Sequence, residues 1–320
     1  MTVGRRGRAA RVLATSVVVV AVSACGSAGE PPDAPSRTPS APATTATVPD
    51  DVTSSLRVEV RQDRTQYAEG TAKLHVTNGS AATLTLLSGS MGADGFGPSG
   101  PDGAQQPATL RPGAARDVRI TLGDVDCASA PPASGPPGDD GEGTVPVRMT
   151  VALGEAAASG PPREVALTAT DPHGRLAAVH TQECARRLVA SGASLSVLPD
   201  LATERRGGEL VLLLRVRVEP VPGGPRVAVE RITGTTLMAP ADGSEAWTGD
   251  AVEPDGAGDV VLDVVPQRCD PHAVAEDKRG TFTPVLTTVD GVAQPPVYLP
   301  LPEEARAAFF DYVSAACDWD

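Results

Sequence analysis

The densest group of polar side chains beside a cysteine lies at 269–278, which reads CDPHAVAEDK. Imidazole and carboxylate groups at such spacings are donors that zinc accepts. The same residues also predict a capped helix, because Asp is a good N-cap and Pro suits the first helical position. We therefore predict a helix start and no bound metal. The candidate binding surface consists of five side chains: Asp270, His272, Glu276, Asp277 and Lys278.

A second Asp-Pro-His tripeptide lies at 171–173, ahead of His180 and Cys184. Residues four apart share one face of a helix, so His180 and Cys184 could contact a single metal ion. A cysteine in a disulfide is no thiolate ligand, however. The N-terminal segment described below predicts export to a compartment that favours disulfides. We therefore predict that this tripeptide also starts a helix and that the chain needs no metal or other cofactor.

Catalytic motifs are weak in this sequence. Gly95, Gly97 and Gly100 spell GxGxxG, but Pro98 and Pro101 interrupt the place where a nucleotide-binding helix would have to start. This segment is therefore interpreted as a flexible loop. The sequence contains no HExxH motif, no P-loop and no nucleophile elbow. We predict no catalytic residues and a protein that is not an enzyme.

Alternation of apolar and polar residues dominates the rest of the chain, as in VPVRMTVAL at 145–153. A period of two with β-branched residues predicts half-buried strands. Many short strands separated by turn residues favour a mainly all-β fold of two tandem Ig-like β-sandwich domains, each ending in a short helix. The predicted strands are 56–60, 71–77, 83–87, 118–122, 145–153, 163–169, 209–218, 226–233, 259–265, 282–289 and 296–301.

A weak internal repeat supports two modules. PGAARDVRITLGDVDC at 112–127 aligns without gaps to PDGAGDVVLDVVPQRC at 254–269, and a helical pattern precedes a second cysteine in each half. We predict β-sandwich modules at 52–200 and 201–320. Four cysteines allow three pairings. If the modules are copies, each carries its own disulfide, Cys127 with Cys184 and Cys269 with Cys317.

The N-terminus contains four arginines, then an apolar run at 12–24 that is too short to span a membrane, and then Cys25. A basic segment followed by a short apolar one is typical of an export signal. The tetrapeptide Val22-Ser23-Ala24-Cys25, followed by Gly26, resembles the lipobox of bacterial lipoproteins. That resemblance covers only the first 26 residues. It implies removal of signal peptide 1–24 and attachment of a diacylglyceryl group to Cys25.

The stretch 25–51 is rich in Pro, Ser and Thr and is predicted to be a disordered linker. The expected location is therefore the extracytoplasmic face of the cell membrane, with Cys25 as the lipid anchor. The expected membrane contact of such a chain is the insertion of the acyl chains on Cys25 into the bilayer.

The chain has 27 basic and 40 acidic residues and a net charge of −13, which argues against a nucleic-acid partner. These features favour a non-enzymatic binding or scaffolding protein of the cell envelope with a possible envelope protein partner. One alternative is a solute receptor for a transporter, which a deep cleft lined by both domains would favour. The other is a metal-dependent envelope enzyme.

Overall fold

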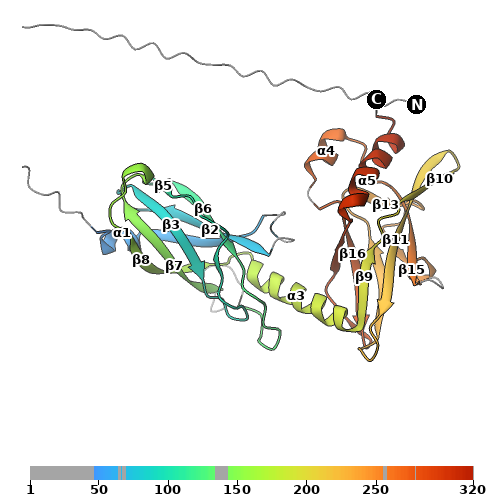
Figure 1. The fold of residues 1–320 in the computed structure, drawn as a ribbon, viewed down its shortest axis with the longest axis horizontal. Helices are drawn as coiled ribbons and strands as arrows, with labels where there is room; N and C mark the ends of the chain where they lie inside the picture. The colour runs from blue at the N-terminus through green and yellow to red at the C-terminus, as the bar shows by residue number, and fades with distance from the viewer. Residues whose placement is uncertain are drawn as a thin grey trace, which may run out of the picture. The chain divides into compact units, whose positions relative to one another are not determined.

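The computed structural model describes residues 47–63, 66, 70–133, 143–254, 258–277 and 279–319. Signal peptide 1–24, the anchor Cys25, most of the linker and Lys278 lie outside these residues. Strands predominate in the described part, which confirms the mainly all-β fold (Figure 1). Each predicted strand range overlaps a strand of the structure.

Eight strands of the first half form one hydrogen-bonded sheet with the order β4-β6-β2-β1-β8-β7-β3-β5. Neighbours are antiparallel except β1 and β8, which are parallel. Helix α1 (Asp50–Ser54) precedes the sheet, and the 3-10 helix η1 (Ala156–Ala158) connects β7 to β8. The strands are β1 (Leu56–Arg61), β2 (Thr71–Asn78), β3 (Leu84–Met91), β4 (Gly100–Pro101), β5 (Ala108–Leu110), β6 (Ala115–Thr121), β7 (Thr144–Leu153) and β8 (Arg163–Thr170).

The alternation in the sequence determines which face of this sheet is buried. Val145, Val147, Met149 and Val151 of β7 are all buried, whereas the residues between them are exposed or half-buried. Side chains two apart lie on one face of a strand, so these four residues join a single apolar cluster with the inner residues of β1, β2 and β6. The strands thus enclose one hydrophobic core.

The second half is a sandwich of two five-stranded sheets. The first sheet contains β9 (Ala193–Val197), β10 (Ala202–Arg206), β11 (Glu209–Pro220), β13 (Met238–Pro240) and β15 (Asp259–Pro266). The second sheet contains β12 (Val227–Thr233), β14 (Ala246–Thr248), β16 (Phe282–Val289), β17 (Val292–Ala293) and β18 (Val297–Pro300). One apolar cluster contains buried residues of both sheets, such as Leu214 and Val285, so the two sheets share a core.

The described part of the second half also contains three helices. The 3-10 helix η2 (Gly249–Val252) follows β14, and α4 (Pro271–Glu276) follows β15. Helix α5 (Glu303–Ala316) comes after β18 and buries Phe309, Tyr312 and Val313 in the core. The helix predicted before Cys317 is therefore present.

Helix α3 (Arg175–Gly192) connects the two groups of strands. Leu176 near its start belongs to the first apolar cluster, and Val189 near its end belongs to the second. The helix begins later than the tripeptide at 171–173 suggests, because the backbone turns at Gly174 with φ 58°. The Asp171 carboxylate still caps it, accepting hydrogen bonds from the Arg175 and Leu176 amides at 2.9 Å each. Strand β9, which precedes residue 200, pairs with β11 in the second half.

Candidate functional site

Two disulfides connect strand ends to helices, and both join the predicted partners. Cys127 is bonded to Cys184 of α3, with Cα atoms 5.5 Å apart, and Cys269 is bonded to Cys317 at the end of α5, with Cα atoms 5.3 Å apart. The predicted pairing is confirmed. Each disulfide fixes the segment after a strand, β6 or β15, to a helix.

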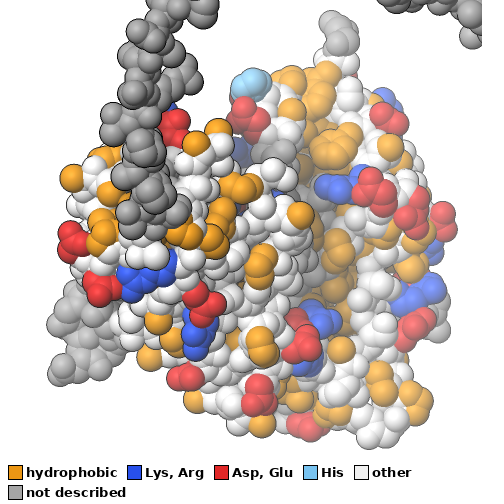
Figure 2. Space-filling view, turned by 60° about the vertical axis from the view of Figure 1, so that its left-hand side comes forward, with side chains coloured by type: hydrophobic (Ala, Val, Ile, Leu, Met, Phe, Trp, Pro, Cys, Tyr) orange, Lys and Arg blue, Asp and Glu red, His pale blue; other side chains and the backbone are white. Residues whose placement is uncertain are grey.

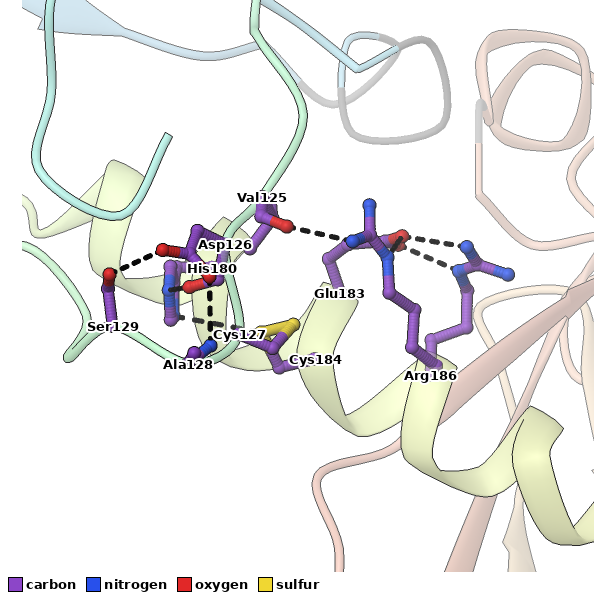
Figure 3. The surroundings of a disulfide bond; sticks show 10 residues. Val125, Asp126, Cys127, Ala128, Ser129, His180, Glu183, Cys184 and Arg186 are labelled. Atoms are coloured by element: carbon purple, nitrogen blue, oxygen red, sulfur yellow. Dashed lines mark hydrogen bonds and ion pairs between the residues drawn. A yellow bond between two sulfur atoms is a disulfide. The ribbon is translucent and has the colours of Figure 1, made fainter. Parts of the chain in front are cut away.

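The first disulfide lies among further contacts between α3 and the loop at 125–129 (Figure 3). His180 is 3% exposed, and its Nε2 lies 3.0 Å from the Asp126 carbonyl oxygen. The Asp126 side chain accepts hydrogen bonds from the Ser129 hydroxyl at 2.6 Å and the Ala128 amide at 3.0 Å. The bond from Ser129 lowers the pKa of Asp126. The loop is thus held to α3 by covalent and hydrogen bonds.

Gly95, the first residue of the GxGxxG pattern, also contacts His180. A Cβ atom at Gly95 would lie 2.7 Å from Cδ2 of His180, and the residue has a φ of 74°. Both facts favour glycine, because other residues rarely adopt this backbone conformation and would collide with the ring. The sequence does not indicate this contact, since nothing in the motif points to His180 as its partner.

Glu183 of α3 holds two arginine side chains (Figure 3). Nε and Nη2 of Arg186 donate to its two carboxylate oxygens at 2.7 Å each, and Nε of Arg187 donates to Oε1 at 2.7 Å. Nη1 of Arg187 also donates to the Val125 carbonyl oxygen at 2.7 Å. The hydrogen bond from Arg186 lowers the pKa of Glu183, and the same bond raises the pKa of Arg186. We call Glu183, Arg186 and Arg187 the arginine–glutamate triad.

The triad lines a cavity of about 930 Å³. Other lining residues come from the loops around Phe96 and at 122–125, from the segment after α4, and from β16, β18 and α5. Three of the four phenylalanines of the chain line it, together with Tyr298 and with Arg279 and Arg306. The cavity therefore combines aromatic rings with guanidinium groups.

The predicted binding surface at 270–278 is only partly assembled. Asp270 caps α4 by accepting from the His272 amide at 2.9 Å. His272 and Glu276 contact each other at 3.3 Å, with 87% and 73% of their side chains exposed. Asp277 accepts hydrogen bonds from the Thr236 hydroxyl and the Arg279 amide, and it lines the cavity. The surface stays a prediction, and of its described members only Asp277 lines the cavity.

A polar network on β2 and β6 was not predicted. Nδ1 of His75 lies 2.7 Å from Asp117, and Nζ of Lys73 lies 3.5 Å from the same carboxylate and also contacts Asp63. Burial raises the pKa of Asp117, but the hydrogen bond with His75 and the charge of Lys73 outweigh this and lower it. The sequence shows polar residues at alternate positions, but not the strand register that pairs His75 with Asp117.

Metal ligands do not gather in the described ranges, where no group of three or more His, Cys, Asp or Glu could hold an ion. The helices in these ranges include none with the length and apolar character needed to cross a membrane. Acidic and basic side chains are interspersed over the face in Figure 2 rather than gathered by sign. Many form exposed ion pairs, such as Arg148 with Glu164.

No family model matches the chain, and no curated protein matches it. Among solved structures, the chain is similar to one in the CsuC–CsuE chaperone–tip adhesion subunit pre-assembly complex from the archaic chaperone-usher Csu pili of Acinetobacter baumannii. The identity is 11%, the match covers 72% of this chain and 91% of that one, and the TM-score is 0.16. A TM-score this low supports no argument about fold or function.

Proposed function

We propose that the chain is a non-enzymatic binding protein of the cell envelope, anchored to the extracytoplasmic face of the membrane through lipidated Cys25. The observation that carries the binding function is the cavity of about 930 Å³. Its volume lies in the range of small-molecule sites, and its lining combines apolar surface with a few oriented polar groups, as such sites do.

The proposed location is supported by two independent features. The first is the N-terminal sequence with its resemblance to a lipobox. The second is the pair of disulfides, because disulfides persist in oxidising compartments and are rare in the cytosol. Together they favour a chain that folds after export.

The polar groups of the cavity suit recognition better than catalysis. A general base works best with a pKa near the working pH. Glu183 has its pKa lowered and its oxygens bonded to two arginines, so it is a fixed carboxylate that does not exchange protons near neutral pH. Its role is to hold the guanidinium groups in place.

Native mass spectrometry of the chain, released gently from the membranes of the cells that make it, tests this proposal. We expect a bound small molecule on the wild-type chain and on the control Ala190→Trp, which changes an exposed residue of α3 outside the cavity lining. Gln182→Trp places a large ring in the cavity and should lose the bound mass. Equal loading of both variants, or no bound mass on any of the three, would contradict the proposal.

A solute receptor for a transporter is the second candidate, and the lining favours it because it draws on residues from both predicted modules. A receptor must release its solute to a transporter. The molecule bound to the wild-type chain should therefore exchange with free molecules during dialysis. A ligand that stays bound until the chain unfolds would exclude this role.

A further inference from the structure

We propose that the cavity binds an amphiphilic anion, a ligand with an apolar body and one carboxylate, sulfonate or phosphate group. This inference rests on the proposed binding function and names the class of its ligand. Three features of the cavity carry it: the donors of the arginine–glutamate triad, the aromatic rings, and the charge of the lining.

The triad presents hydrogen-bond donors in fixed positions. One carboxylate, Glu183, holds both Arg186 and Arg187, so the three side chains together carry one net positive charge. A guanidinium group has five N–H donors, and Arg186 uses two of them on Glu183. Within the described residues its other N–H groups have no partner, which leaves donors that match a planar anionic group.

The position of the triad is fixed by two bonds between α3 and the loop at 125–129. Nη1 of Arg187 is bonded to the Val125 carbonyl oxygen, and the Cys127–Cys184 disulfide ties the same loop to the helix. Val179 and Gln182 lie one turn before the triad on the same helix face and also line the cavity. The anion site is therefore preorganised, which reduces the entropy lost on binding.

Aromatic side chains supply the apolar part of the site. Phe96, Phe282, Phe310 and Tyr298 line the cavity in a chain with only 3% aromatic residues. Phe310 keeps 36% of its surface exposed, which a ligand with an apolar body would cover. Arg279 lies over the Tyr298 ring at 4.5 Å, so positive charge and aromatic surface adjoin each other here too.

The sign of the charge differs between the lining and the whole chain. The described lining contains four arginines and three carboxylates, those of Glu183, Asp124 and Asp277, whereas the chain carries a net charge of −13. Asp277 is bonded to the Arg279 amide and the Thr236 hydroxyl. An anion is thus better accommodated in this cavity than over the surface at large.

Two fluorescent dyes that differ by one charged group test the inference. Anilinonaphthalene sulfonate has an aromatic body with a sulfonate, and N-phenylnaphthylamine has the same body without it. We expect saturable binding of the anionic dye at one site per chain, with an affinity at least tenfold higher than that of the neutral dye.

Two variants test whether the anionic dye binds at the arginine–glutamate triad. Arg186→Gln should weaken binding of the anionic dye about tenfold, since a charged hydrogen-bonding partner is lost, and should leave binding of the neutral dye unchanged. Arg148→Gln is the matched control, because Arg148 is exposed, pairs with Glu164 on the eight-stranded sheet and lies outside the lining. Equal losses in both variants, with unchanged melting temperatures, would overturn the inference.

Competition experiments with the anionic dye distinguish two sources of an amphiphilic anion, a lipid and a free aromatic acid. Displacement of the anionic dye by laurate indicates a lipid-derived ligand, and displacement by naphthoate indicates a free aromatic acid. Displacement by neither would overturn the inference. If the two dyes bind equally, or if neither binds while native mass spectrometry finds a bound molecule, the anion preference is wrong and the proposed binding function stands.

Discussion

At the scale of single residues, Tyr312 shows how one buried side chain holds α5 to the first sheet of the sandwich. It is 4% exposed, and its hydroxyl lies 2.7 Å from the Val264 carbonyl oxygen and 3.2 Å from that of Leu210. Burial raises the pKa of Tyr312 to about 12. The folded chain therefore favours the neutral phenol, which can donate a hydrogen bond, over the phenolate.

This pKa predicts a loss of stability in alkaline solution. The pKa of Tyr312 in the folded chain lies above the ordinary value of 10. Its contribution to the free energy of unfolding is therefore complete below pH 10 and is lost as the pH rises toward 12. The loss amounts to roughly 2–3 kcal/mol. In urea titrations, Tyr312→Phe should cost about 1 kcal/mol at neutral pH and should flatten the alkaline decline, whereas Tyr298→Phe should keep it. A decline of the same size in Tyr312→Phe would contradict this account.

Gly95 gives a second test at this scale. Gly95→Ala meets both a φ of 74° and the His180 ring, whereas Gly103→Ala meets a similar φ of 66° with nothing within 4 Å. We expect Gly103→Ala to cost about 1 kcal/mol from backbone strain and Gly95→Ala to cost at least 1 kcal/mol more. The urea midpoints of the two variants measure the difference, and equal midpoints would mean that the loop does not pack on His180.

At the scale of elements, local patterns predicted the longer strands and the pairing of the cysteines. The alternation at 145–153 predicts β7, because side chains two apart share one face of a strand and the residues on the buried face of β7 are apolar. The repeat predicts the disulfides, because copies of one module pair their cysteines alike. Seven strands of the described residues escape prediction, since a strand of two to five residues shows too little alternation to be recognised: β4, β5, β9, β10, β13, β14 and β17.

The cavity could not be predicted for a different reason. Its residues are brought together by the path of the chain and not by sequence spacing, so Phe96 and Phe310 carry no shared local signal. Part of the triad could have been found, because Glu183 and Arg187 have the spacing of a helical ion pair. The contact of Arg187 with Val125 could not have been predicted, because it depends on the path of the loop at 125–129.

Removing each disulfide tests how much that bond stabilises the folded chain. The bonds span 57 and 48 positions, and loops of this length imply a loss of roughly 4 kcal/mol for each bond removed. We expect Cys127→Ser with Cys184→Ser, and separately Cys269→Ser with Cys317→Ser, to lower the free energy of unfolding in urea. Only the first pair should also weaken dye binding. An unchanged urea midpoint in either double variant would show that its bond does not constrain the chain.

At the scale of the whole molecule, an acidic chain combines a proposed lipid anchor with a cavity whose lining has the opposite charge balance. Repulsion from acidic membranes would leave attachment to the acyl chains on Cys25. Cys25→Ala should therefore release the chain from the membrane fraction or leave it unprocessed. Ser23→Ala, which keeps a small residue and the cysteine, should remain membrane-bound. A Cys25→Ala chain that is cleaved normally and stays in membranes would refute the anchor.

The central claim is that the cavity is where this protein binds its ligand, and photocrosslinking in intact cells tests it most directly. A benzophenone amino acid is placed at Gln182, in the cavity lining, or at Ala190, exposed on the same helix outside it. We predict that irradiation adds one discrete small-molecule mass at position 182 and none at position 190, with peptide mapping that assigns the adduct to α3. The same adduct at both positions, or none at either, would contradict the account.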